Sequence, residues 1–93
     1  ELLFFVSPSI DEETRAATMK RVETTIAAGN GAIDNVDDWG KRKLAYEING
    51  LTDGDYTLID FHAEPENIAE LDRVLRITDA IVRHMIVKRT DRD

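Results

Sequence analysis

The fold is decided by the segment Leu2-Leu3-Phe4-Phe5-Val6, which is apolar at every position. A short apolar run of this kind predicts a strand, and successive side chains of a strand point to opposite faces of a sheet. If Leu2, Phe4 and Val6 pack beneath helices, Leu3 and Phe5 must point to the other side. We therefore expect a strand with apolar side chains on both of its faces.

Two amphipathic helices are expected after this strand. In each, apolar residues recur at spacings of three and four, which predicts one buried stripe. Either Ser9 or Asp11 can cap the first helix, over residues 14–28, and the glycines at 29 and 31 end it. Pro65 opens the second helix, where its missing N–H costs nothing. The expected buried positions are Met19, Val22 and Ile26 in the first helix and Ile68, Leu71 and Leu75 in the second.

Three further strands are expected along the chain. The first covers residues 32–36, is interrupted near 37–40, where Gly40 marks a bulge or bend, and continues over 44–48. The others cover residues 56–61 and 81–87. The resulting order is β-α-β-β-α-β, and two right-handed βαβ units of this kind form a four-stranded antiparallel sheet with both helices on one face. The expected fold class is α+β.

Two helices can cover only one face of such a sheet, so the opposite face is expected to be open. In the strand over 56–61, Ile59 and Phe61 are expected to face the helices, and their neighbours to face away. A contiguous apolar patch of a few hundred Å² usually marks a contact surface for another protein. The side chains expected on the open face, for a partner to bind, are Leu3, Phe5, Tyr56 and Leu58.

Length and composition fit a single domain over residues 1–93. The chain is 42% apolar and 33% charged, which is typical of a globular domain and not of a disordered chain. It contains no cysteine, which excludes disulfides and thiolate metal sites and agrees with a reducing cytoplasmic setting. Its longest apolar run, residues 2–6, is far too short to span a membrane.

Positive charge is gathered in two places, although the formal net charge is −7. Three consecutive cations form the run Lys41-Arg42-Lys43, and the last strand and its end carry Arg83, Lys88 and Arg89. Clustered lysine and arginine typically meet phosphate, which favours a surface that binds a polyanion. The alternative is a solvated basic edge that prevents pairing between sheets. The residue types alone leave both interpretations open.

Two aromatic side chains flank the basic run. Trp39 precedes it, and Tyr46 follows it in the next strand segment. Each can stack on a nucleobase or anchor its own segment against the protein. For Trp39 the burial habits of tryptophan favour the anchoring interpretation.

Catalytic or metal chemistry has little support in the sequence. The two histidines, His62 and His84, lie on different strands, and there is no serine-centred elbow or metal-ligand spacing. We therefore expect no enzyme activity, cofactor, metal site or small-molecule substrate. Two alternatives on the same topology are a small-ligand regulatory domain and an acylphosphatase-type enzyme. The loop 7–10 has neither the glycines that the first needs nor the arginine that the second needs.

The segment Gly40-Lys41-Arg42-Lys43-Leu44-Ala45-Tyr46-Glu47-Ile48 and residues 75–88 are similar to two segments of a known family. They resemble the signature and the last helix-to-strand segment of the sixth protein of the bacterial small ribosomal subunit. The similarity extends from Glu1 to about Thr90, which is essentially the whole chain. Trp39 before the glycine and the acidic first residue also resemble actinobacterial members of the family.

The resemblance implies a ferredoxin-like domain without enzymatic activity, located in the cytoplasmic ribosome. Members of the family form a heterodimer with small-subunit protein eighteen and bind the central domain of the small-subunit (16S) ribosomal RNA. That partner would cover the apolar side chains of the open face. The residues that the resemblance assigns to RNA or partner contact are Lys41, Arg42, Lys43 and Tyr46 on the hairpin side, with Arg83 and Lys88 at basic positions of the last strand.

Overall fold

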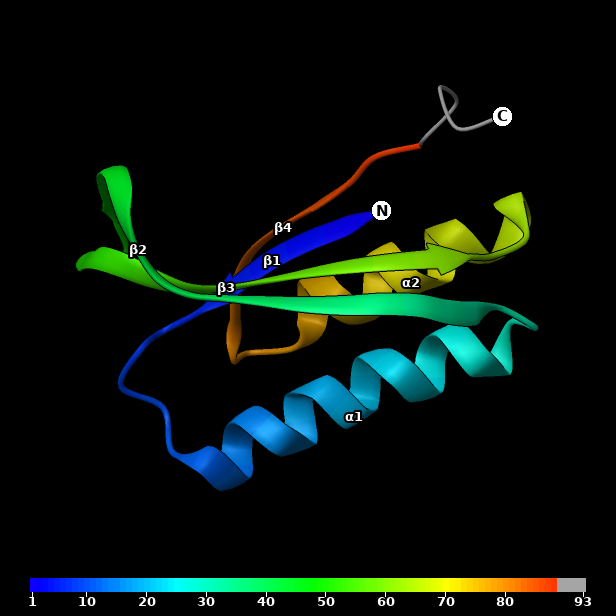
Figure 1. Ribbon diagram of the computed structural model, residues 1–93, viewed down its shortest axis with the longest axis horizontal. Helices are drawn as coiled ribbons and strands as arrows, with labels where there is room; N and C mark the ends of the chain where they lie inside the picture. The colour runs from blue at the N-terminus through cyan, green and yellow to red at the C-terminus, as the bar shows by residue number, and fades with distance from the viewer. Residues whose placement is uncertain (89–93) are drawn as a thin grey trace.

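The chain alternates strands and helices in the order β-α-β-β-α-β, as the sequence predicts (Figure 1). The computed structural model describes residues 1–88. The elements are β1 (Leu2–Val6), α1 (Glu12–Ala28), β2 (Ala32–Ile48), β3 (Leu51–His62), α2 (Pro65–Ile77) and β4 (Ile81–Ile86).

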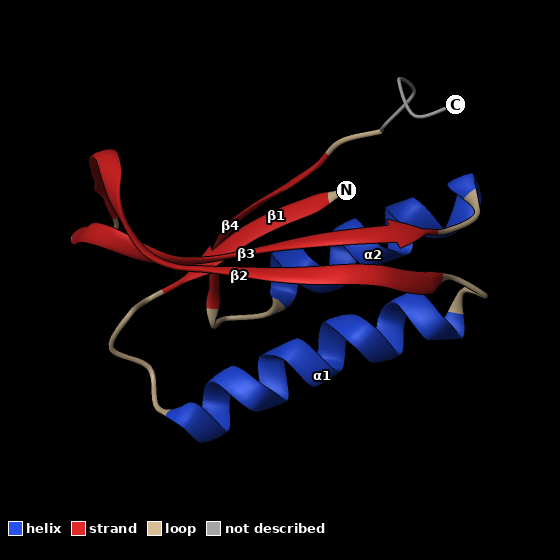
Figure 2. Ribbon diagram, viewed as in Figure 1, coloured by secondary structure: helices blue, strands red, loops and turns tan. Residues whose placement is uncertain are grey.

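The four strands form one sheet in the order β2-β3-β1-β4, and every neighbouring pair is antiparallel. Both helices lie on the same side of this sheet, which leaves the other side without a covering layer (Figure 2). The α+β, ferredoxin-like prediction is confirmed. The apolar segment 2–6 becomes β1, an interior strand flanked by β3 and β4.

The helix-facing core contains the alternate residues of β1 that the sequence assigns to it. Leu2, Phe4 and Val6 are buried there, and Ile59 of β3 is fully buried beside them. The helices contribute most of the predicted stripe, although Ile68 is only half-buried and Val74 is the additional buried position of α2. The remaining core residues are Val22, Ile26, Leu71, Leu75 and Ile81, with Met19 and Phe61 packed against them.

The first turn of α1 is fixed by Asp11, one of the two residues proposed as its cap. Oδ1 of Asp11 accepts a hydrogen bond from the backbone N–H of Thr14 at 2.7 Å. That bond holds the pKa of Asp11 below its ordinary value. Ser9 does not cap the helix, because its hydroxyl lies 2.9 Å from the hydroxyl of Ser7. Pro65 is the first residue of α2, as predicted.

The main difference from the prediction is the length of β2 and β3. β2 runs unbroken from Ala32 to Ile48, with a register shift between Asp38 and Gly40 in place of an interruption. Gly40 has a φ of +73°, and its N–H donates to Oδ1 of Asp38 at 3.0 Å. A bulge with its own hydrogen bond lets the strand bend and continue.

The two strands are joined by the two-residue turn Asn49-Gly50, with φ values of +50° and +81°. Positive φ at both positions is the backbone conformation that closes a tight hairpin. β1 pairs with residues 55–59 of β3 only, so the end of the hairpin extends past β1. We call residues 41–54 the hairpin arm, and Figure 1 shows it bending away from the helices.

Candidate protein and RNA interface

The open face of the sheet carries a row of apolar side chains. The row crosses the two inner strands, β3 and β1, and the edge strand β4. The register pairs Leu3 of β1 with Leu58 of β3 on one side and with Met85 of β4 on the other. Directly opposite residues of neighbouring strands share a face. Leu3 and Leu58 are half-buried, as is Tyr56. These three side chains therefore lie on the face away from the helices, as the sequence predicts.

Phe5 is a correction to the predicted open face. It points away from the helix-facing core, yet only 5% of it is exposed. Its ring centroid lies 5.0 Å from that of Tyr56, and a Cβ placed on Gly54 would lie 2.6 Å from its Cδ1 atom. The prediction that Phe5 is exposed until a partner covers it is wrong, because the backbone of the hairpin arm already covers its ring.

Sequence reasoning missed Met85, which is 56% exposed. Val87, two residues further along, is 43% exposed, and its N–H donates to the carbonyl of Glu1 at 2.8 Å. A signal was available, because Met85 and Val87 occupy alternate positions of the strand expected over 81–87 and so share one face. In the sequence, only the cations of this strand and its end, Arg83 and Lys88, are assigned a role.

The basic run lies on the hairpin arm, in the part of β2 that passes beyond β1. Lys41, Arg42 and Lys43 are all exposed and stand opposite Asp55, Gly54 and Asp53 in the register. Among residues 1–88, the ion pairs of the structure involve three arginines and two histidines but none of these three cations. Tyr46, nearer the turn, is 67% exposed. The arm therefore presents its cations and one aromatic ring to solvent.

The two basic positions of the last strand lie at different ends of the sheet. Arg83 is exposed and paired with Phe5, which is itself paired with Tyr56 and thus aligned with Gly40 at the base of the arm. Lys88 is exposed beyond the end of β4, next to the N-terminus. The structure therefore brings Arg83, but not Lys88, toward the end of the sheet that carries the basic run. Arg89 lies outside the described residues.

Trp39 is held by its own neighbours at the base of the arm. Its ring stacks on Tyr56, with centroids 6.2 Å apart and planes 28° apart. Its indole N–H donates to Oδ2 of Asp37 at 3.2 Å. Trp39, Tyr56 and Phe5 thus form an aromatic row across three strands. This arrangement agrees with the anchoring interpretation of the tryptophan.

The histidines take part in ion pairs between elements. Nε2 of His84 lies 2.7 Å from Oδ1 of Asp72, which ties β4 to α2. Hydrogen bonds from His84 and then Arg76 hold the pKa of Asp72 below its ordinary value. His62 pairs with Asp34 across the β2–β3 ladder. Within the described part of the chain, no group of three or more His, Cys, Asp or Glu side chains is placed to hold a metal ion.

None of the helices in residues 1–88 combines the length and the apolar character that a membrane crossing requires.

Comparison with known proteins identifies the family. The family described as Ribosomal protein S6 matches residues 1–88. The small ribosomal subunit protein bS6 of Clostridium perfringens is 56% identical over 88 residues, covering 95% of this chain and 93% of the relative. The same protein of Clostridium beijerinckii is 52% identical over 87 residues, covering 94% and 92%. These clostridial relatives give no support to the expected actinobacterial character.

A solved structure gives the same answer for the fold. The crystal structure of 30S ribosomal protein S6 from Thermotoga maritima superposes with a TM-score of 0.90 at 37% identity. The match covers 97% of this chain and 85% of that protein. The sequence match and the structural match each cover almost the entire chain. The chain therefore belongs to the ribosomal protein S6 family, whose members are structural, non-enzymatic proteins of the small ribosomal subunit.

Proposed function

We propose that this protein binds the central domain of 16S ribosomal RNA through its hairpin arm, in the cytoplasmic ribosome. The observation that carries the proposal is the basic run. In a chain of net charge −7, three adjacent cations stand exposed on the hairpin arm, and none of them forms an ion pair with another residue of the described range 1–88. Exposed cations that form no ion pair within the protein can displace the counterions of a phosphate backbone. We include Tyr46, Arg83 and Lys88 in the proposed RNA surface.

We further propose that small-subunit protein eighteen covers the open face as a heterodimer partner. Leu3, Tyr56 and Leu58 are the predicted contacts that remain partly exposed, and Met85 extends the same apolar row to the sheet edge. Phe5 packs against Tyr56 but is itself buried, so it is not a proposed contact with the partner. Covering roughly 300 Å² of apolar area contributes about 7 kcal/mol before the costs of association, and the charged contacts to RNA add to it when the complex forms.

Salt dependence tests the RNA contact most directly. Replacing Lys41, Arg42 and Lys43 together with alanine should reduce the slope of log K against log salt by about 2 to 3, since each phosphate contact contributes roughly 0.7 to 0.9. The measurement uses the protein with its partner and the RNA fragment. The matched control is Lys20→Ala with Arg21→Ala, two exposed cations on α1. An unchanged slope in the triple variant would rule out the basic run as the contact.

The alternative small-ligand function has weaker support. Two cavities among residues 1–88 measure about 250 and 270 Å³, slightly below the usual size of ligand pockets. The larger of them lies between α1 and the sheet, where Phe4, Met19 and Val36 contribute apolar walls. Calorimetry with amino acids and nucleotides discriminates the two functions, because a saturable micromolar signal would favour this alternative.

A further inference from the structure

The base of the hairpin arm is the point where β3 leaves its partner β1. Val6 pairs with Asp55, and the residues of β3 before Asp55 pair with β2 alone. A two-stranded ribbon without further support is only marginally stable and free to twist. The direction of the arm, and of its cations, is therefore set by whatever holds Gly54 and Asp55 against the body.

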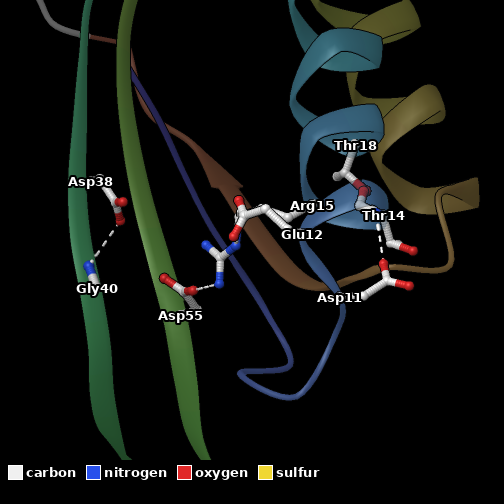
Figure 3. A network of polar contacts seen from close by, with 8 residues as sticks. All are labelled: Asp11, Glu12, Thr14, Arg15, Thr18, Asp38, Gly40 and Asp55. Carbon is white, nitrogen blue, oxygen red and sulfur yellow. Dashed lines mark hydrogen bonds and ion pairs between the residues drawn. The ribbon is translucent and has the colours of Figure 1, made fainter.

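On the helix side, Asp55 is held by Arg15 of α1. An Nη atom of Arg15 donates to Oδ2 of Asp55, which is 8% exposed (Figure 3). Oδ1 of Asp55 is buried and has no hydrogen-bond partner in the described structure. A buried carboxylate is costly unless it is paired, so this residue depends on the guanidinium of Arg15.

Arg15 itself lies in the first turn of α1. The Asp11 cap orders that turn through the N–H of Thr14, and Nε of Arg15 lies 4.0 Å from Glu12 (Figure 3). Arg15 is the only link among the ion pairs of residues 1–88 between α1 and the sheet. Among these ion pairs, Arg15 alone connects the helix to the base of the arm.

On the opposite side, the backbone of Gly54 lies against the ring of Phe5, so closely that a Cβ there would be 2.6 Å from the ring. Across the ribbon, Asp38 accepts from the N–H of Gly40 and braces the bulge (Figure 3). At the base of the arm, Asp55 is therefore held on the helix-facing side of the sheet and Gly54 on the opposite side.

We infer that Arg15 and Asp55 form a clamp that positions Lys41, Arg42 and Lys43 for RNA. Lys41 is directly opposite Asp55 in the register, so the carboxylate that Arg15 holds is cross-strand neighbour to the first cation of the run. Arg15 acts through Asp55 and is a positioning residue, not a contact to phosphate. The inference rests on the proposed RNA-binding function of the basic run.

The clamp has a definite consequence for binding. An arm that is already ordered loses little conformational freedom when it meets RNA, whereas a loosened arm must be ordered by the binding energy. Fixing even one residue corresponds to roughly a tenfold change in affinity. Loss of the clamp should therefore weaken RNA binding while the number of phosphate contacts stays the same.

The first experiment measures the arm in the free protein. The chain has no cysteine, so spin labels can be attached at Glu47→Cys on the arm and Glu23→Cys on α1, both exposed positions. We expect the distance distribution between the labels to broaden in Arg15→Met and in Asp55→Ala, and to stay narrow in Arg15→Lys, which keeps the charge. Equal widths in all four proteins would overturn the clamp, whatever the arm binds.

The second experiment measures binding to the RNA fragment in the presence of the partner. Both Arg15→Met and Asp55→Ala should weaken binding roughly tenfold with an unchanged salt slope. Asp55→Ala is decisive, because removal of a negative charge would by itself strengthen binding to RNA. Wild-type affinity in Asp55→Ala, or a lower slope in Arg15→Met, would overturn the positioning role.

Two controls keep the outcomes separate. Leu71→Val weakens the core on α2, away from the arm. Its RNA affinity, measured at a temperature where every variant is folded, shows the effect of reduced stability alone. The triple alanine variant of the basic run tests the proposed function itself. If its salt slope is unchanged, the RNA contact fails, while the label distances still decide whether the clamp exists.

Discussion

Gly54 is a residue whose missing side chain leaves room for a neighbouring ring. A methyl group at this position would lie 2.6 Å from the ring of Phe5, in a part of β3 where the backbone itself is buried. We expect Gly54→Ala to reduce the free energy of unfolding by about 1 to 3 kcal/mol, the usual cost of overpacking. Urea unfolding measures it.

A double-mutant cycle identifies the cause of that loss. In the background of Phe5→Leu, which removes the ring, Gly54→Ala should cost clearly less than it does alone. Equal costs in the two backgrounds would show that the strain lies elsewhere in the hairpin.

Asp72 makes stability depend on pH in the acid range. Hydrogen bonds from His84 and Arg76 lower its pKa in the folded protein relative to the ordinary value of 3.8. A carboxyl group whose pKa is lower in the folded than in the unfolded protein stabilises the fold at pH values above its unfolded pKa. That stability is lost as the pH falls through the folded pKa. We therefore expect Asp72→Asn to be less stable than wild type near neutral pH and to lose less stability below about pH 4.

Thermal unfolding between neutral and strongly acidic pH measures this effect. Asp79→Asn, an exposed position just after α2, is the matched control and should follow the wild-type profile. Parallel profiles for Asp72→Asn and wild type would contradict the role of the His84 contact.

Single residues show where reasoning from the sequence stops. The alternation of β1 assigns Phe5 to the open face correctly, because direction follows from strand geometry alone. Its burial depends on Gly54, a residue nearly fifty positions away that reaches it only after the hairpin bends. The partner of Asp55 is equally hidden, since nothing in the local sequence connects it to Arg15 on a helix.

Helix α1 owes its starting point to one of two candidate caps. Asp11 accepts from the N–H of Thr14, whereas Ser9 contacts Ser7. We expect Asp11→Ala to cost about 1 kcal/mol of stability, the typical value for a lost cap, and Ser9→Ala to cost much less. Chemical denaturation of both variants makes the comparison. A larger loss of stability in Ser9→Ala than in Asp11→Ala would identify Ser9 as the cap.

The two central strands show why elements are predicted unevenly. β1 and both helices agree with the sequence closely, because their signals are local periodicity, caps and proline. The segment 51–55 precedes the strand expected over 56–61, yet it belongs to β3. Its conformation is decided by pairing with β2 and by the ring of Phe5, and such tertiary contacts override local preference.

At the scale of the whole molecule, the family could be identified from two segments, and the fold from the order of its elements. The topology follows because helices on one face and apolar alternation in β1 leave few arrangements. The contents of the open face could be predicted only in part. Leu3, Tyr56 and Leu58 follow from alternation, whereas Met85 belongs to the row because β4 is paired with β1 in one particular register.

The open face supplies the last prediction, at the scale of assembly. If small-subunit protein eighteen is the partner, as proposed, Met85→Asp should weaken its association by at least tenfold, because a charge placed in an apolar contact loses its water without gaining a partner. Ile77→Asp is the matched control, since Ile77 is similarly exposed, at 52% against 56% for Met85, but lies at the end of α2. Calorimetric titration of the partner into each variant measures the difference. If Met85→Asp binds as tightly as wild type while Ile77→Asp does not, the partner binds the helix side, and the apolar row of the sheet serves another purpose.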